Sequence, residues 1–275
     1  MIDNVIKWIL NHFLLILIFS MGLFLRLYIA HADPFLHNWD ERFHALVAKS
    51  LMLDPLKPIL IANPVGSYDP NSWCCNNIWL HKQPLFMWQM ALSMKFFGVS
   101  EFSIRYPSVL MGALMILLVY RITTLLTSKK LTAIIAALLM ACSHYQLALI
   151  AGRLGMDHND LAFGFYILAS IWAYCEYIIN PKWYWALLVG FFSGAAILNK
   201  WLAGLLVYSA WGIMLLIKIL RKRSKIDLWY FLFSILVCII VFVPWQWYIL
   251  VQYPEQARFE YSFNTRHLFE VVEGH

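Results

Sequence analysis

Charge is what this sequence has least of: charged residues make up 13% of its 275 residues, whereas 62% are hydrophobic. A soluble domain usually carries about 25% charged and about 45–50% apolar residues. Together with a mean hydropathy of +0.67, this composition indicates a polytopic membrane protein. The net charge of +6 does not indicate a nucleic-acid partner, because most basic residues flank hydrophobic segments, where they contact lipid headgroups.

Other signals are missing as well. The first apolar run is followed by His31-Ala32-Asp33-Pro34, which is not a signal-peptide cleavage site, so we expect a retained anchor. The sequence has no internal repeat, no low-complexity tract and no metal-ligand spacing. The lack of repeated halves disfavours a transporter, which usually carries ionisable groups in broken helices at mid-membrane. Three cysteines lie in apolar segments as packing residues. The adjacent Cys74 and Cys75 are expected as free thiols, with separate partners or a metal as the alternative.

Hydropathy predicts an all-α polytopic membrane protein with about seven transmembrane helices, since each crossing needs about 20 mostly apolar residues. The predicted spans are 8–29, 103–126, 131–150, 161–179, 183–198, 201–218 and 228–250. Basic residues beside them place the N-terminus in the cytoplasm and the C-terminus outside. One helix over 183–218 would be about 50 Å long, so we predict two helices that meet near Asn199-Lys200. A single, strongly tilted helix is the alternative.

The whole chain, 1–275, is interpreted as a single transmembrane module. Segment 30–102 is predicted to be a long first outer loop, and apolar spacing predicts juxtamembrane helices over 39–52 and 84–97 within it. Residues 251–275 are predicted to begin a second outer loop that is truncated, because the sequence stops there without a helix cap or a tail.

Asp40-Glu41 follows the first apolar helix directly. Two acids at the mouth of a membrane helix need solvent, a cation or a chemical task, although an ordinary helix cap also explains them. The predicted topology brings further acids, bases and histidines to the same outer face. Lysine and arginine neutralise phosphate, and a carboxylate accepts a proton or holds a cation, so the pattern favours transfer from a phosphate-linked donor.

Several of the acids, bases and histidines predicted at the outer face also have a purely structural interpretation. Arg105 and Arg153 could anchor helix ends in headgroups, and Asp157 or Asp160 could cap a helix. His81 and His158 are more often polar loop residues than metal ligands, so the residues themselves leave the metal question open.

Five motifs, in order along nearly the whole chain, resemble the polyprenyl-phosphate-sugar glycosyltransferases of the GT-C class. That class includes the protein O-mannosyltransferases and the bacterial lipid A aminoarabinose transferases. The motifs are Asp40-Glu41, Lys82-Gln83-Pro84-Leu85, the run from Phe97 to Pro107, the run from Gly152 to Asp157, and Ala196-Ile197-Leu198-Asn199-Lys200.

The resemblance implies many membrane helices around an outer catalytic cavity, and inverting transfer from a dolichyl- or undecaprenyl-phosphate sugar. Asp40 takes the catalytic acid position, Glu41 is its companion, and Asp157 takes the second carboxylate position. The positions expected to contact the donor phosphate are those of Lys82, Lys200 and Arg105. His81 stands where aminoarabinose transferases carry an acid that can hold a metal, so a divalent cation is the cofactor to consider.

The resemblance further implies a hexosyl- or pentosyltransferase of the bacterial inner membrane, with its site on the extracytoplasmic face. Its partners would be the lipid-linked donor, membrane lipids, and an acceptor that is a protein, lipid A or a glycan. The alternatives are a catalytically incomplete, truncated relative and a membrane transporter or partner-binding protein.

Overall fold

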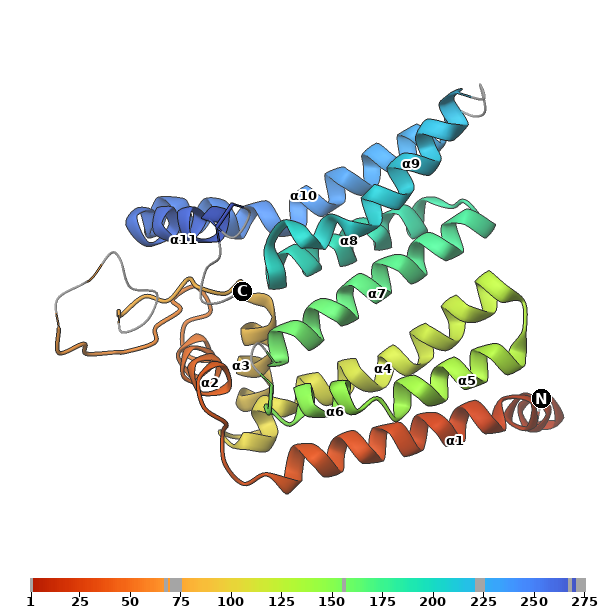
Figure 1. The fold of residues 1–275 in the computed structure, drawn as a ribbon, viewed down its shortest axis with the longest axis horizontal. Helices are drawn as coiled ribbons and strands as arrows, with labels where there is room; N and C mark the ends of the chain where they lie inside the picture. The colour runs from red at the N-terminus through yellow and green to blue at the C-terminus, as the bar shows by residue number, and fades with distance from the viewer. Residues whose placement is uncertain are drawn as a thin grey trace.

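The computed structural model describes residues 2–66, 69, 76–154, 157–220, 226–266 and 269–270. These residues form helices joined by loops, together with an isolated β-bridge between Ile59 and Ile78. The all-α fold class predicted from hydropathy is therefore confirmed. Long helices lie side by side in one bundle, and shorter helices gather at one of its ends (Figure 1).

The helices divide between the bundle and that end, which we call the α2 end. The bundle contains α1 (Ile2–Ala32), α4 (Glu101–Thr127), α5 (Lys130–Ala141), α6 (His144–Ile150), α7 (Asp157–Ile179), α8 (Trp183–Lys200), α9 (Leu206–Leu220) and α10 (Ile226–Gln252). The α2 end carries α2 (Asp40–Leu51), α3 (Leu85–Phe97) and α11 (Pro254–Arg266), and the short 3₁₀ helix η1 (Trp201–Leu205) joins α8 to α9. The helix α11 lies where the sequence predicted only the start of a loop.

Within the described part of the chain, five helical runs are long and apolar enough to cross a membrane. The number becomes six if α5 and α6 are counted together as one bent span. One of the five, Trp183–Leu220, contains both α8 and α9. The predicted number of about seven crossings therefore stays a prediction.

The predicted break in 183–218 is confirmed. Helix α8 ends at Lys200, and Trp201 has a φ of 52°, which a continuous helix does not allow. Helix α9 then packs against α7, where the rings of Trp211 and Tyr177 lie 4.8 Å apart. Near the end of α9, Lys218 Nζ lies 3.0 Å from the Asp227 carboxylate at the start of α10. The alternative of one tilted helix is wrong.

The span predicted over 131–150 is not one continuous helix: α5 and α6 are separate and bent by 41°, and together they can still form one broken span. The buried side chain of Arg26 explains how the break is tolerated. Its Nη1 donates to the Ala141 carbonyl at 3.1 Å, and its Nη2 donates to the Met140 carbonyl at 3.0 Å. These carbonyls lose their helical partners at the break, and an apolar environment offers no water to replace them.

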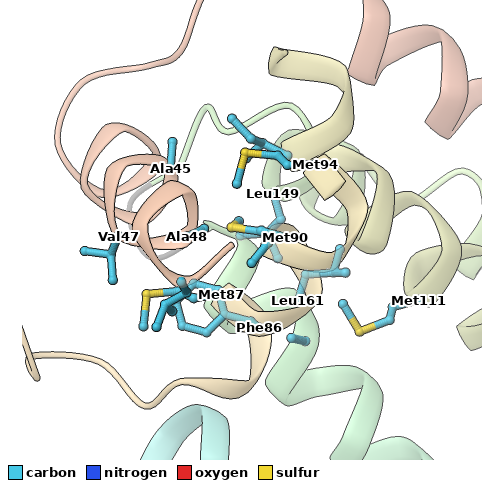
Figure 2. Close-up of a cluster of buried hydrophobic side chains, with 14 of the residues drawn as sticks. Ala45, Val47, Ala48, Phe86, Met87, Met90, Met94, Met111, Leu149 and Leu161 are labelled. Carbon is cyan, nitrogen blue, oxygen red and sulfur yellow. The ribbon is translucent and has the colours of Figure 1, made fainter. Parts of the chain in front are cut away.

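The main core lies where α2, α3, α4, α6 and α7 meet (Figure 2). Met87, Met90 and Met94 on α3 are each 1% exposed, and they pack against apolar residues of the neighbouring helices. Both helices predicted within the first loop are therefore present. Each buries an apolar face against the protein, which fixes α2 firmly with respect to the bundle.

Candidate active site at the α2 end

The acidic pair begins α2 and its two members differ in environment. Asp40 is the first residue of the helix and is partly exposed, whereas the Glu41 side chain is fully buried. The backbone N–H of His37 donates to Glu41 Oε2 at 2.7 Å. An acidic residue in the first turn is favoured by the helix dipole, but full burial requires further partners.

Arg105 of α4 is the main partner of Glu41. Its Nε donates to Oε1 at 2.7 Å and its Nη2 donates to Oε2 at 3.2 Å, a bidentate pair with both side chains 0% exposed. The remaining N–H groups of Arg105 donate to the carbonyls of Ala30, Asp33 and Phe35. All five donors of the guanidinium are thus used, and Arg105 ties α4 to α2 and to the end of α1.

His158, in the first turn of α7, completes the surroundings of Glu41. Its Nε2 lies 3.3 Å from Glu41 Oε1, and its Nδ1 lies 2.8 Å from the Ser108 hydroxyl. Burial on its own raises the pKa of the Glu41 carboxyl. The hydrogen bonds from His158 and Arg105 outweigh this effect and hold the pKa below its ordinary value of 4.5.

The first turn of α7 also contacts Lys200, the lysine at the end of α8 that was predicted to bind the donor phosphate. Asp160 Oδ1 accepts a hydrogen bond from Lys200 Nζ at 2.6 Å, and both side chains are partly exposed. Lys200 also lines a groove of about 640 Å³ whose walls are mostly apolar, with Ile197, Phe242 and Gln246 among its lining residues. Asp160 lies inside α7 and pairs with a cation, so its interpretation as a helix cap is wrong.

The segment that carries Lys82 lies beside this groove. Gln83 Oε1 accepts from Gln246 Nε2 at 2.7 Å, and Gln246 itself lines the groove. On the other side of Lys82, His81 Nδ1 lies 3.2 Å from Glu260 of α11. The structure therefore brings the Lys82 segment and Lys200 to the same part of the α2 end.

Two expectations are left open. Asp157 begins α7, but its side chain lies outside the described part of the structure. Among the described residues, no three His, Cys, Asp or Glu side chains lie close enough to share a metal ion. His81 and Glu260 form a pair that offers two ligands, so a metal at His81 stays a prediction.

Sequence reasoning missed the residues that hold the site together. His158 read as a loop residue, yet it contacts Glu41 from a helix. Asp33 was not singled out, although its carboxylate contacts His37 at 3.2 Å and Arg153 at 2.9 Å. One sequence feature marks this part of the site: a glycine, Gly152, directly precedes Arg153. In the structure Gly152 has a φ of 70°, a backbone conformation that favours glycine.

Replacing Gly152 by alanine is expected to displace Glu41. A Cβ at this position would overlap the Glu41 carboxyl group, and the positive φ adds a cost of about 1–2 kcal/mol for any side chain. We therefore expect a clearly lower thermal transition of the purified protein in detergent.

Gly98 provides the matched control for this prediction. Its φ is 80°, but nothing lies within 4 Å of a Cβ built on it, so Gly98→Ala carries only the backbone cost. Equal losses of stability in Gly152→Ala and Gly98→Ala would show that a Cβ at position 152 does not interfere with Glu41.

Comparisons with known sequences agree with this picture. A sequence model of the dolichyl-phosphate-mannose-protein mannosyltransferase family matches residues 81–248. An uncharacterized protein of Aquifex aeolicus is 27% identical over 217 residues, which cover 78% of this chain and 39% of that protein. Undecaprenyl phosphate-alpha-4-amino-4-deoxy-L-arabinose arabinosyl transferase 2 of Pseudomonas fluorescens is 28% identical over 181 residues, or 62% of this chain and 31% of that enzyme. The chain thus spans less than half the length of these relatives.

Solved structures share the fold. Apo ArnT from Cupriavidus metallidurans superimposes with a TM-score of 0.67 at 16% identity, covering 90% of this chain and 43% of ArnT. The Archaeoglobus fulgidus oligosaccharyltransferase gives a TM-score of 0.62 at 16% identity, with 98% of this chain and 35% of that enzyme covered. With its long apolar helices, the chain is an integral membrane protein. Because the family match extends over more than half of the chain, this chain belongs to the dolichyl-phosphate-mannose-protein mannosyltransferase family.

Proposed function

We propose that this chain is the catalytic membrane part of an inverting glycosyltransferase, which moves a sugar from a polyprenyl phosphate to an acceptor. Its place would be the bacterial inner membrane, with the α2 end on the extracytoplasmic face. One observation carries the proposal: the first turn of α7 contacts Glu41 through His158 and Lys200 through Asp160. A carboxylate pair and a phosphate-binding cation are thereby held at the same end of the bundle.

The groove beside Lys200 suits the donor. Its apolar walls fit an isoprenoid chain, and the ammonium group of Lys200 at its edge would neutralise the phosphate. Lys82 lies on the segment that borders this groove and would supply a second positive charge. One solved ArnT structure is described as bound to undecaprenyl phosphate; its TM-score with this chain is 0.53. We infer a donor of that class, with either an undecaprenyl or a dolichyl chain.

The reaction needs one bond to form and one to break. The acceptor oxygen attacks C1 of the sugar from the side opposite the phosphate, and the C1–O bond to the lipid phosphate breaks. The phosphate leaves with the bonding electrons, and its charge is stabilised by Lys82 and Lys200. An alcohol acceptor transfers its proton to Asp40 as general base. A phosphate acceptor is already anionic and needs no base, and Asp40 then orients the acceptor or a cation.

The other site residues receive supporting roles in this proposal. Arg105 donates every N–H within the protein, so we assign it and Glu41 to positioning α2 rather than to contact with the donor phosphate. Asp157 is proposed as the second carboxylate of the site. If a divalent cation takes part, His81 and Glu260 would provide two of its ligands, and no step described above depends on it.

Binding of a short-chain polyprenyl-phosphate sugar to the purified protein in detergent tests the donor site. We expect saturable binding by the wild type and a dissociation constant at least about tenfold higher for Lys200→Ala, since a hydrogen bond to a charged group contributes about 1.5–3 kcal/mol. Lys95→Ala is the matched control, because Lys95 is exposed in the last turn of α3 and does not line the groove.

The two variants decide the assignment together. If Lys200→Ala binds the donor as tightly as wild type, Lys200 does not hold the phosphate and the proposed donor site is wrong. An equal weakening in Lys95→Ala would mean that the total positive charge, rather than the groove, determines binding.

A further inference from the structure

Asp160 is an acid that the proposed mechanism leaves without a task. It lies in the first turn of α7, where its Oδ1 accepts a hydrogen bond from Lys200 Nζ at 2.6 Å. The start of α7 and the end of α8 thus meet at the α2 end of the bundle (Figure 1). Lys200 is the cation proposed to hold the donor phosphate, so the charge of that cation is already partly neutralised before any lipid binds.

The pair is open rather than buried. The Lys200 side chain is 39% exposed and the Asp160 side chain is 22% exposed. A salt bridge with this degree of exposure contributes little to the stability of a fold. The effect of Asp160 is therefore to be sought in the groove that Lys200 lines, rather than in the packing of α7 against α8.

Lys200 carries the charge of this groove. It is the charged residue among the lining residues that the structure describes, and the others are apolar or neutral, such as Phe242, Gln246 and Asn264. Its ammonium group also lies 5.9 Å from the centre of the Phe163 ring, one turn beyond Asp160 on α7. Two contacts from α7 thus orient the ammonium group, and two of its three N–H groups remain for a ligand in the groove.

A phosphate bound to Lys200 would also be repelled by Asp160. Two groups that each accept a hydrogen bond from the same ammonium nitrogen lie about 4–5 Å from one another. Like charges interact strongly at this distance. Asp160 therefore weakens the binding of any anion to Lys200, and the weakening grows in proportion to the charge of the anion.

The charge of the phosphate changes during the proposed reaction. The donor is a phosphodiester with one negative charge. When its C1–O bond breaks, the leaving oxygen keeps the bonding electrons, so the product is a phosphomonoester with close to two negative charges above its second pKa of about 6. Among the two lipids, the product is the anion that an isolated lysine would bind more tightly and release more slowly.

We propose that Asp160 sets the selectivity of the groove between these two lipids, because it lowers the affinity for the phosphomonoester product more than the affinity for the phosphodiester donor. Asp160 acts through Lys200 and by charge repulsion, without touching the reacting atoms. It thereby speeds the release of the spent lipid phosphate and keeps the groove available to the donor. This inference rests on the proposed function and adds a selectivity residue to its donor site.

Binding of two lipids to the purified chain in detergent at about pH 8 tests the inference. The lipids are a short-chain polyprenyl phosphate and its methyl ester, which is a phosphodiester. Asp160→Asn keeps an oxygen that can accept from Lys200 and removes the charge. We expect this variant to bind the diester about threefold and the monoester about tenfold more tightly than wild type, since doubling the charge of the ligand squares the fold-change. Asp160→Glu keeps the charge and should retain the wild-type ratio of the two affinities.

Asp54→Asn is the matched control, since it removes one negative charge from an exposed position at the same end of the molecule and outside the groove. If Asp160 only positions Lys200, Asp160→Asn will bind both lipids as wild type does or more weakly, and the inference is then wrong. A gain of equal size for both lipids, or the same gain in Asp54→Asn, would also overturn it.

Lys200→Ala measured with the same two lipids separates this inference from the proposed function. If the diester binds in a Lys200-dependent manner while Asp160→Asn does not favour the monoester, the proposed donor site stands and Asp160 has no part in its selectivity. If the wild type binds neither lipid, the proposed donor site and the inference are both wrong.

Discussion

Asp40→Asn is expected to lower the rate of sugar transfer to an alcohol acceptor by about 10²–10⁴-fold, the usual contribution of a general base. Asparagine keeps the size of the side chain but does not accept the proton of the attacking hydroxyl. Folding should be unaffected, because Asp40 is partly exposed and α2 is held by the buried Glu41. The measurement is transfer of radiolabelled sugar from the lipid-phosphate donor to acceptor, with thermal unfolding recorded on the same samples.

Asp54→Asn is the control, because it makes the same chemical change at an exposed acid just beyond the end of α2. Near-normal turnover in Asp40→Asn would remove Asp40 from the chemistry. Loss of activity accompanied by a large loss of stability would instead assign Asp40 a structural role. Donor binding should be unchanged in Asp40→Asn, since Lys82 and Lys200, which would hold the phosphate, are not altered.

How far the fold follows from the sequence depends on whether the cause is local. Asn199-Lys200 interrupts an apolar run, and α8 does end there. The break between α5 and α6 carries a weaker local signal, the N-cap Ser143 that accepts from the Gln146 N–H, and its other stabilising partner is Arg26, 115 residues from Ala141 in sequence. Hydropathy predicts which segments avoid water, but it does not predict which distant side chain will satisfy a freed carbonyl.

For the candidate site, too, the placement of residues was predictable from the sequence, but the contacts between distant residues were not. Membrane topology placed Asp40, Lys82 and Lys200 at one end of the bundle, because residues flanking successive helices alternate between two surfaces. The pairings within that end were not predictable, since His158 and Glu41 are 117 residues apart and meet only when α7 packs near α2. Arg105 is an example. The sequence predicted that it contacts the donor phosphate, but its N–H groups donate to Glu41 and to backbone carbonyls inside the protein.

Glu41→Gln is expected to produce the largest loss of stability. Glutamine leaves the guanidinium of Arg105 buried without its counter-charge, and breaking a buried pair from one side costs about 3–5 kcal/mol. The thermal transition in detergent should fall by roughly 10 °C. Glu270→Gln is the control, because Glu270 pairs with Arg266 at the surface with both side chains more than half exposed, and such pairs contribute little.

A double variant and a pH series complete the test of the Glu41 pair. Glu41→Gln combined with Arg105→Met removes both charges, so it should be less destabilised than the sum of the two single variants. The Glu41 carboxyl has a lowered pKa in the folded state, so its stabilising effect is fully present above the ordinary pKa of 4.5 and is lost as the pH falls through the folded value. Wild-type stability should therefore fall more steeply below pH 4.5 than that of Glu41→Gln. Parallel pH curves for the two proteins would mean that Glu41 does not pair with Arg105 as an ionised group, and the positioning role assigned to both residues would then be wrong.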